Sequence, residues 1–488
     1  MSKYINQKLE AYSRFLEGKR VAVLGVGISN IPLIKFLLEC GAVVNARDKK
    51  PVEELAKNKN LDILKLEKSG VRFFTGEDYL HSLNEDVIFK TPGLRCDRAE
   101  ILKAHERGAL VTSEMEVFLS ICPSKIIAVT GSDGKTTTTT LIAKILEDAG
   151  HTVHLGGNIG KPLLYETSKM LPEDFAVLEL SSFQLHSIGY FGDGRSPVPQ
   201  ACFPDVAVIT NISPNHLDWH TSYEEYADSK KTIFKYMKNG GKLVTNAANE
   251  ITAGYAEEAA ANGTQVRLFS AKINPGKGYF ADEKTIYCDG KPILSRELIK
   301  LPGVHNAENY MAAIAATADF VSAENVRHIA ESFGGVEHRL EYVATIDGAD
   351  FFNSSIDSSP SRTIAAVTSF PAECRKKLIL IMGGYDKHIP YAPIGEPICK
   401  AAQAVFLCGA TAEKIKEALT SAPNYDGSTE IFLYSDFREA VCGAADYARK
   451  GDKVILTPAS ASFDLFKNFE ERGKFYKSII RSLEKNQN

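Results

Sequence analysis

One stretch of the sequence, residues 126–138, restricts the fold of this chain more than any other. It joins an apolar run typical of a buried strand, Ile126–Val129, to a turn with two glycines, then to Lys135 and several threonines. Apolar residues at helical spacing follow, and Gly150 stands where the helix should end. The stretch therefore predicts a strand, a tight turn and the start of a helix in direct succession.

A turn of this kind can bind phosphate, because free backbone N–H groups and the positive end of the helix dipole meet there. Lys135 adds a positive charge for the β- and γ-phosphates, and the Thr136 hydroxyl can be a ligand of Mg²⁺. Val129 stands where the strict phosphate-loop motif has its first glycine, so an ordinary glycine turn is the alternative. The Gly-Lys-Thr-Thr run between a strand and a helix favours a nucleoside triphosphate site.

Composition limits the class of protein. A length of 488 residues suggests about three domains, and 44% hydrophobic residues supply a core for each. The net charge of -4 favours neither nucleic acid nor an anionic membrane as a partner. The nine cysteines are scattered singly, which suits reduced thiols, and no apolar run is long enough to span a bilayer. We therefore expect a cytoplasmic protein that acts on small molecules.

The N-terminal region predicts a Rossmann-like unit. Arg20–Gly25 has the composition of a buried parallel strand, a G-x-G turn follows, and a second strand, Ala42–Ala46, leads to Asp48. The third glycine of the dinucleotide-binding fingerprint is Asn30 here, so a turn that binds nothing fits the pattern about as well. We place the first domain over residues 1–112.

The central region carries two candidate metal ligands. Glu179 stands near the end of an apolar strand, Phe175–Leu180, where a nucleotide-bound Mg²⁺ commonly finds its protein ligand. His216 lies in the loop after the next predicted strand, Val206–Asn211. A loop histidine usually only meets solvent, so the position of His216 does not by itself indicate a ligand.

Lys230 occupies an unusual place. It falls on the apolar face of a helix that we expect to begin with a capping box, Ser222-x-x-Glu225, and to end at Gly240. Its stem could pack while its ammonium reaches water, or the lysine could be held in a site and chemically modified. The sequence favours these two interpretations equally.

The C-terminal region predicts a second doubly wound parallel sheet. A glycine hinge near residue 335 separates it from the central domain, residues 113–335, which ends with a helix over residues 307–320. Beyond the hinge, over residues 336–488, strands and helices alternate. Ligands of such sheets lie at the carboxyl ends of the strands, here the loops Gly383–His388 and Pro458–Phe463. The fold class is thus α/β in three domains, with a P-loop ATPase-type parallel sheet in the centre.

Five motifs in this order resemble the Mur ligase family along nearly the whole chain. The first is the phosphate loop itself, Thr130–Thr137, which resembles the ATP loop of the family. The other four resemble the members of the family that add D-glutamate: Glu179–Leu185, Glu337–Glu341, Gly383–Lys387 and Lys467–Arg472. Five matches in the same order are far more specific than any one of them.

The resemblance implies a set of roles for individual residues. ATP would be bound by Gly131, Ser132, Asp133, Gly134, Lys135, Thr136, Thr137, Asn306, Asn309 and Arg339. Two Mg²⁺ ions would be held by Thr136, Glu179, His216 and Lys230, the last as a carbamate formed with CO₂. The catalytic set would be Lys135, Glu179, His216, Lys230 and Arg339. The UDP end of a substrate would be held by Ser29, Asp48 and Gly93, and D-glutamate by Ser358, Lys387, Ser462 and Phe469, with Asn158 and Ser181 completing the substrate-binding set.

The resemblance also implies a reaction. The γ-phosphoryl group of ATP would move to the terminal carboxylate of UDP-N-acetylmuramoyl-L-alanine, and the amine of D-glutamate would attack the resulting acyl phosphate. Such a monomeric enzyme would serve peptidoglycan precursor synthesis, and with it cell shape and division. One motif departs from the family, which has Asn-Asp-Ser-Lys-Ala-Thr where this chain has Asn353–Ser358. Ser354 and Ile356 replace the Asp and Lys that contact nucleotide, so contacts at these two positions are not predicted.

Three other functions stay open at this point. A related ligase, such as one of the folylpolyglutamate type, could add another amino acid, although Lys387 and the stretch Ser462–Arg472 argue against it. A protein that hydrolyses ATP to switch a partner would share the phosphate loop. A nicotinamide oxidoreductase is disfavoured by Asn30. Release of phosphate only in the presence of both cosubstrates would separate a ligase from an ATP-driven switch.

Overall fold

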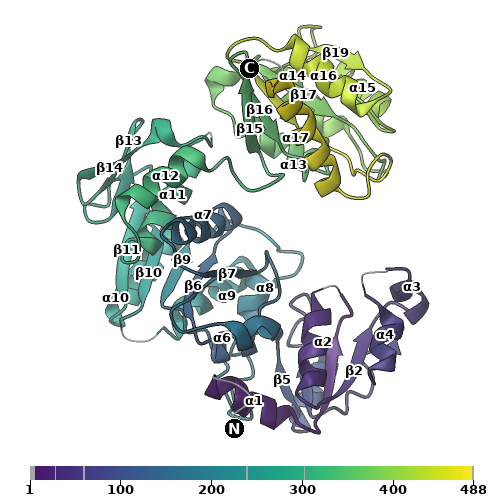
Figure 1. Cartoon of the computed structure of the whole chain (residues 1–488), viewed down its shortest axis with the longest axis vertical. Coiled ribbons are helices and arrows are strands. Elements are labelled where there is room, and N and C mark those ends of the chain that lie inside the picture. The colour runs from purple at the N-terminus through teal and green to yellow at the C-terminus, as the bar shows by residue number, and fades with distance from the viewer. Residues whose placement is uncertain (1–5, 28, 59–60, 238–239, 302, 486–488) are drawn as a thin grey trace. The chain divides into compact units, whose positions relative to one another are not determined.

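The computed structural model describes residues 6–27, 29–58, 61–237, 240–301 and 303–485. The chain divides into two compact units, whose elements are labelled in Figure 1. The first unit contains Met1–Leu294 and Glu308–Ile329, and the second contains Ser295–Ala307 and Ala330–Asn488. The division therefore falls inside helix α11, Val304–Thr317. Among the described residues, no helix combines the length and the apolar character needed to cross a bilayer.

The N-terminal sheet has five strands in the order β3-β2-β1-β4-β5, and each neighbouring pair is parallel. The order reverses between β1 and β4, so a ligand crevice is expected at the carboxyl ends of these two strands. The predicted Rossmann-like topology is confirmed. The strands are β1 Arg20–Leu24, β2 Val43–Asp48, β3 Arg72–Thr75, β4 Val87–Phe89 and β5 Leu110–Thr112. The helices are α1 Gln7–Leu16, α2 Asn30–Glu39, α3 Val52–Ala56, α4 Ile63–Lys68 and α5 Ala99–Glu106.

The central sheet has nine strands in the order β14-β13-β12-β11-β10-β9-β6-β8-β7. Strand β6 lies between β8 and β9 and pairs in parallel with both. The strands are β6 Lys125–Thr130, β7 Val153–Gly157, β8 Phe175–Glu179, β9 Val206–Ile209, β10 Lys242–Asn246, β11 Gln265–Ser270, β12 Tyr279–Ala281, β13 Thr285–Cys288 and β14 Lys291–Ser295. The helices are α6 Glu114–Ile121, α7 Lys135–Asp148, α8 Ser182–Ser187, α9 Tyr223–Lys235, α10 Glu250–Ala261, α11 and α12 Ala323–Ser332, with short 3₁₀ turns at Leu164–Lys169 and Arg296–Leu298.

The two sheets of the first unit share one apolar core. Val87 and Phe89 of β4 belong to the same buried cluster as Ile126 and Ala128 of β6. This shared core holds the carboxyl ends of the N-terminal strands beside the central region. The predicted boundaries at residues 112 and 335 stay predictions.

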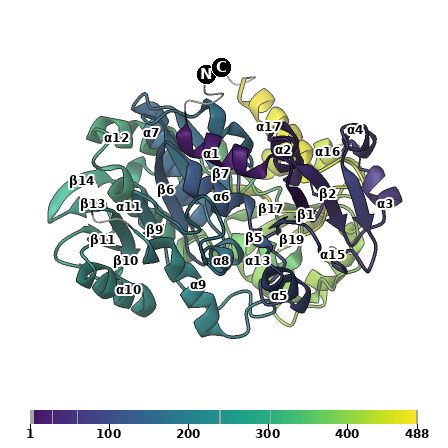
Figure 2. The ribbon, with the colours of Figure 1, turned by 90° about the horizontal axis from the view of Figure 1, so that it is seen from below.

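The second unit contains a six-stranded sheet in the order β15-β16-β20-β17-β18-β19. Strands β17 and β19 of this sheet are labelled in Figures 1 and 2. Its strands are β15 Glu341–Ile346, β16 Ala349–Asn353, β17 Leu378–Met382, β18 Ala402–Leu407, β19 Glu430–Leu433 and β20 Lys453–Leu456. Its further helices are α13 Pro360–Thr368, α14 Gly395–Ala401, α15 Ala412–Thr420, α16 Phe437–Tyr447 and α17 Phe469–Lys485, with 3₁₀ turns at Ala372–Cys374 and Ala392–Ile394. Only β15 is antiparallel to its neighbour among the pairs described.

Both faces of this sheet are covered by helices, and its central strand β17 is apolar and buried at every position. On β17, Ile379 and Ile381 pack with α16 and α17, whereas Leu378, Leu380 and Met382 pack with α13, α14 and α15. This alternation confirms the predicted doubly wound fold.

The predicted bounds of helices α9 and α11 are wrong. Helix α9 ends at Lys235 instead of Gly240, because Tyr236 leaves helical geometry and its hydroxyl lies against Gly189. The capping box of this helix is only half formed. The Ser222 hydroxyl accepts the Glu225 N–H at 3.1 Å, but the Glu225 carboxylate accepts from Thr221 and from an arginine instead. Helix α11 begins three residues before the predicted start at Ala307 and ends at Thr317, three residues before the predicted end at Phe320.

Candidate functional site

The phosphate loop forms as the sequence predicts, between β6 and α7. Gly131 and Gly134 have φ values of 146° and 78°, which other residues rarely adopt. A Cβ at either position would also overlap a neighbour, the Thr210 hydroxyl for Gly131 and the Asn309 amide oxygen for Gly134. Both glycines are therefore required for the shape of the loop.

The loop is held by the segment that follows β9. The Ser132 hydroxyl lies 2.7 Å from the Tyr226 hydroxyl and donates to the Ser213 carbonyl at 2.9 Å. The Asp133 N–H donates to the Asn211 side chain at 3.0 Å. Thr136 and Thr137 lie in the first turn of α7. These bonds fix the loop without using the side-chain carboxylate of Asp133.

Two lysines meet at one backbone carbonyl of the loop. Lys135 Nζ donates to Gly131 O at 3.0 Å and to Ser132 O at 2.8 Å, and Lys230 Nζ donates to Gly131 O at 2.8 Å. Lys230 is 2% exposed and its Nζ lies 4.8 Å from the centre of the Tyr226 ring. The interpretation of Lys230 as a lysine held in a site is therefore the one that the structure supports.

Burial and, to a smaller extent, the nearby positive charge of Lys135 lower the pKa of Lys230 to about 7, against the opposing effect of Glu179 and Asp133. A large share of this amine is therefore neutral near pH 7, which is the form that reacts with electrophiles.

Glu179 is buried on β8, and only one of its two carboxylate oxygens accepts a hydrogen bond from the described residues. Its Oε1 accepts from Asn158 Nδ2 at 2.8 Å, whereas its Oε2 has no hydrogen-bond partner among the described residues. A buried carboxylate oxygen without a partner is costly unless a cation or another donor reaches it. Glu179 thus fits a role as an oxygen ligand.

His216 lies in the loop after β9 with a φ of 54°, and its side chain is exposed. Its ring centre lies 4.9 Å from that of Phe183. Partial desolvation lowers the pKa of His216, as do the charges of Lys135 and Lys230, while Asp218 raises it. The imidazole therefore lies near the same two lysines as the phosphate loop.

Within the described ranges, no three His, Cys, Asp or Glu side chains are arranged to hold a metal ion. Of the four predicted ligands, only Glu179 and His216 belong to these residue types, and the other two are Thr136 and Lys230. They include one hydroxyl and one amine, and an ammonium is not a ligand of Mg²⁺. The set fits this ion only if Lys230 carries oxygen atoms.

A cavity of about 640 Å³ opens at the carboxyl ends of β1 and β4. Three of the predicted substrate-binding residues line it: Ser29, Asp48 and Asn158. The two oxygens of Asp48 accept the N–H groups of Val26 at 2.6 Å and Lys50 at 2.8 Å, so this carboxylate shapes the glycine turn. The cavity has the size of a small-molecule site.

Two further predicted residues lie outside the lining of this cavity. The Gly93 carbonyl accepts from the Trp219 indole at 2.9 Å. The Ser181 hydroxyl accepts the Gln184 N–H at 3.2 Å and caps α8, so it positions Gln184, which does line the cavity.

In the second unit, three loops follow the neighbouring strands β16, β20 and β17. Lys387 Nζ donates to Ser358 O at 3.2 Å and Ser358 Oγ at 3.4 Å, so the structure brings these two predicted residues together. Ser462 is buried in the loop after β20, and the Phe469 carbonyl accepts from Ser355 Oγ at 2.8 Å. The loops meet at the carboxyl edge, where parallel sheets bind ligands.

Three residues outside the phosphate loop are also predicted to bind nucleotide: Asn306, Asn309 and Arg339. Asn309 Oδ1 accepts from Thr138 Oγ1 at 3.2 Å and thus lies against the first turns of α7. Asn306 is buried on α11, and Arg339 is exposed after the glycine hinge.

Sequence reasoning missed three features of these sites. Lys90 is buried and lines the 640 Å³ cavity, and Arg95 pairs with Glu225 at 2.9 Å. Asp357 is buried beside Ser358, and burial raises the pKa of its carboxyl to about 6. Lys90 had a visible signal, a cation directly after the apolar strand β4, but the other two depend on contacts between distant segments.

Comparison with known proteins adds independent findings. The model of the Mur ligase middle domain matches residues 129–317, and that of the Mur ligase glutamate ligase domain matches residues 338–460. Proteins named UDP-N-acetylmuramoylalanine–D-glutamate ligase are similar over 98% of this chain and 100% of their own length. The one from Ruminiclostridium cellulolyticum is 47% identical and the one from Acetivibrio thermocellus 46%. The structure is also similar to that of a solved UDP-N-acetylmuramoyl-L-alanyl-D-glutamate–2,6-diaminopimelate ligase, with a TM-score of 0.58 and 19% sequence identity. The match covers 97% of this chain and 94% of that ligase, and at this identity it supports the fold alone.

Proposed function

The chain belongs to the Mur ligase family, and from that premise we propose that it adds D-glutamate to UDP-N-acetylmuramoyl-L-alanine in peptidoglycan precursor synthesis. The observation that best supports this function is the sequence identity of 46–47% to proteins named as D-glutamate ligases, along nearly the full chain. Two features of the structure also support it. The phosphate loop suits ATP, and Lys387 with Ser358 and Ser462 at the edge of a sheet suits an acidic amino acid.

ATP is the proposed energy source. The N-terminus of α7, the N–H groups of the loop and Lys135 supply positive charge where the β- and γ-phosphates would lie. Phosphoryl transfer depends mostly on positioning and on such charges. The γ-phosphoryl group goes to the terminal carboxylate of the UDP-linked substrate and leaves ADP and an acyl phosphate.

The amine of D-glutamate then attacks the acyl carbon, the C–O bond to phosphate breaks, and an amide remains. Lys387 and the hydroxyls of Ser358 and Ser462 are proposed to bind the carboxylates of D-glutamate, because a desolvated carboxylate needs a cation and donors. Phe469 would pack on the methylene groups.

Two Mg²⁺ ions are part of the proposal, held by Thr136, Glu179, His216 and a carbamate on Lys230. When bound, the ions would neutralise phosphate charge as it develops. The unpartnered Glu179 Oε2 and the largely neutral Lys230 amine support this donor set. Carbamate formation joins Lys230 Nζ to the carbon of CO₂ and releases one proton, and the product presents oxygen atoms in place of an ammonium.

We also propose that the enzyme is a monomer and that it acts in the cytoplasm, where ATP and UDP-linked precursors are found. The test measures the release of phosphate from ATP while the UDP-linked sugar peptide and the amino acid are each varied over a panel. We expect release only when UDP-N-acetylmuramoyl-L-alanine and D-glutamate are both present. Release without either cosubstrate would indicate an ATP-driven switch, and release with a different amino acid would change the substrate.

A further inference from the structure

Lys90 lies at the point of the N-terminal sheet where a ligand is expected. It directly follows β4, and the register that pairs Val23 with Phe89 places it beside the end of β1. The next residue, Thr91, lies 3.6 Å from where a Cβ on Gly25 would stand. Lys90 therefore adjoins the glycine turn at the reversal of strand order, where such sheets hold phosphates.

The charge of Lys90 has no counter-ion in the described chain. The side chain is 4% exposed, and its ammonium donates to Ser187 Oγ at 2.6 Å and to Thr91 O at 3.3 Å, both neutral groups. An ammonium has three donors, so one stays available. Burial lowers the pKa of Lys90, against the opposing effects of Cys96 and Glu116, and Lys90 forms no ion pair with a carboxylate among the described residues.

Glu116 is also fully engaged elsewhere. Its Oε1 accepts the Gly189 N–H at 2.7 Å, and its Oε2 accepts from Thr112 at 2.7 Å and Gln200 at 3.1 Å. A buried cation without an opposite charge is expensive, and an anionic ligand removes that cost on binding.

The cavity beside Lys90 is the place where an anionic ligand can bind. Lys90, Gly25 and Ser29 line the same 640 Å³ space. The other lysine of this lining, Lys50, is exposed and already pairs with Glu54 at 2.8 Å. Lys90 is therefore the buried cation of the described lining that no carboxylate neutralises.

We infer that Lys90 binds the diphosphate of the UDP-linked substrate through its ammonium, anchored by Ser187. This role rests on the proposed function, since it requires a substrate with a diphosphate in this cavity.

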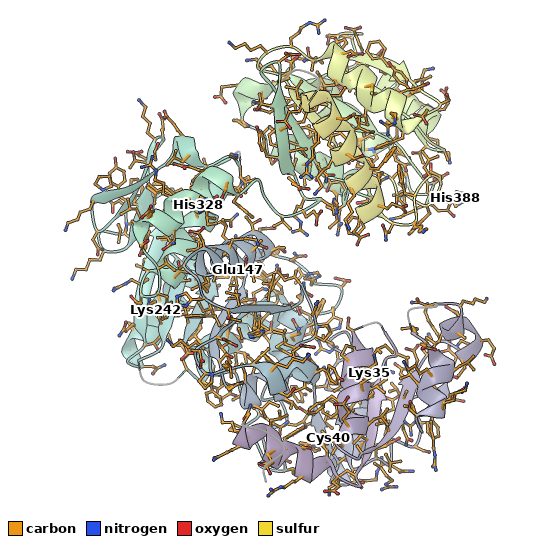
Figure 3. All side chains as sticks on the ribbon, in the orientation of Figure 1. Lys35, Cys40, Glu147, Lys242, His328 and His388 are labelled. Carbon is orange, nitrogen blue, oxygen red and sulfur yellow. The ribbon has the colours of Figure 1, made fainter. Side chains whose placement is uncertain are left out.

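The test compares a charged with an uncharged probe. Binding of UDP and of uridine is measured by calorimetry for the wild-type chain, Lys90→Met and the control Lys35→Met, whose lysine is exposed on α2 and labelled in Figure 3. Lys90→Met should weaken UDP binding about tenfold or more, because truncating one partner of a buried charge pair has that effect. Uridine binding should stay within about twofold for every variant, since uridine carries no phosphate.

Each outcome bears on the inference. A Lys90→Met variant that binds UDP like the wild-type chain overturns it, and so does an equal loss for UDP and uridine, which would make Lys90 a packing residue. Lys90→Arg, which keeps the charge, should retain most of the UDP affinity. Should Lys90→Met fail to fold, Lys90→Gln takes its place with the same expectation. Failure of the wild-type chain to bind UDP would instead overturn the proposed substrate.

Discussion

At the residue scale, the Gly131 carbonyl is the point where the candidate site converges. It accepts hydrogen bonds from both Lys135 and Lys230, one of which is partly exposed and the other buried. Two positive side chains at one carbonyl repel each other, and the pKa of Lys230 is lowered in part for that reason. A triphosphate in the loop would relieve this repulsion, so the pair is arranged for an anion.

Lys135→Ala should remove most of the turnover and leave the fold intact. Lys135 donates to the loop carbonyls of Gly131 and Ser132 from the first turn of α7, so we expect its loss to cost little stability. Loss of one charged donor to a transferring phosphoryl group, in contrast, typically lowers kcat roughly 100- to 1,000-fold. Phosphate release and thermal unfolding measure the two effects. The matched control is Lys144→Ala on the same helix, whose side chain is 53% exposed and pairs with Glu147, labelled in Figure 3. Near-normal turnover of Lys135→Ala would remove this lysine from the catalytic set.

Lys230→Ala should also lose activity, and a small carboxylate such as acetate should partly restore it by supplying the missing oxygens. Because carbamate forms only on the neutral amine, the wild-type enzyme in CO₂-poor buffer should lose activity as pH falls through about 7, the pKa of Lys230. Added bicarbonate should reduce that loss. Turnover at several pH values, with and without bicarbonate, measures the effect.

The neighbouring lysine provides the control for this prediction. Lys231 of α9 pairs with Glu258 of α10 at 2.5 Å, and Lys231→Ala should respond neither to acetate nor to bicarbonate. If acetate rescued both variants equally, or if intact mass showed an unmodified Lys230 under conditions of full activity, the carbamate would be excluded.

At the element scale, the loop that carries His216 is tied to the N-terminal sheet. Arg95, after β4, donates to the Trp219 carbonyl at 3.0 Å and forms two bonds with the Glu225 carboxylate, at 2.9 and 3.1 Å. The Trp219 indole in turn donates to Gly93. The segment that lines the substrate cavity and the loop of a candidate metal ligand thus share one set of bonds.

A double-mutant cycle should reveal this connection. Arg95→Gln and Glu225→Gln should show a coupling of roughly 1–2 kcal/mol at pH 7, since two-point arginine–carboxylate bonds are the strong ones. Arg95 holds the pKa of Glu225 well below its ordinary value of 4.5, so its stabilising contribution is present above pH 4.5 and is lost as pH falls below it. Urea unfolding at pH 7 and pH 3 measures both.

Asp97 serves as the comparison partner in this cycle. It also contacts Arg95, at 2.7 Å, but its side chain is 43% exposed, so the coupling of Arg95→Gln with Asp97→Asn should be smaller. Equal couplings for the two pairs, or no change between pH 7 and pH 3, would contradict the loop-anchoring role.

The elements that the sequence predicts correctly are those whose signal is local. Apolar runs predict strands in each sheet, among them β1, β2, β6, β8 and β9, but strands such as β3, β7 and β15 are not predicted. The phosphate loop follows from two glycines and a lysine between a strand and a helix. The predictions of the end of α9 and of a complete capping box are wrong, because Tyr236 and Glu225 contact residues distant in sequence, Gly189 and Arg95. Lys90 shows the same limit, since its lack of a counter-ion is a property of the folded surroundings.

At the scale of the whole molecule, the predicted sites divide between the two compact units. The first unit holds the phosphate loop and the 640 Å³ cavity, and the second holds Ser358, Lys387 and Ser462. Each unit has its own sheet core, and the two predicted sites consist of different residues. Affinities for the two cosubstrates should therefore respond to different sets of residues.

Lys387→Ala tests this separation. A glutamate carboxylate that loses water on binding needs the cation, and its removal should raise KM for D-glutamate roughly tenfold. KM for ATP and for UDP-N-acetylmuramoyl-L-alanine should change little, because Lys387 contacts only Ser358 among the described residues. Steady-state kinetics with each substrate varied in turn measure the three values.

The control is Lys414→Ala, on the neighbouring helix α15, where Lys414 pairs with Asp386 at 2.5 Å, directly before Lys387 in the same loop. This variant removes an equal charge from the same edge of the sheet and should leave KM for D-glutamate within about twofold. A general effect of surface charge would move both variants alike. If Lys387→Ala instead raised KM for ATP and left D-glutamate saturation unchanged, this loop would belong to the nucleotide, and the cation that selects an acidic amino acid would have to lie elsewhere in the chain.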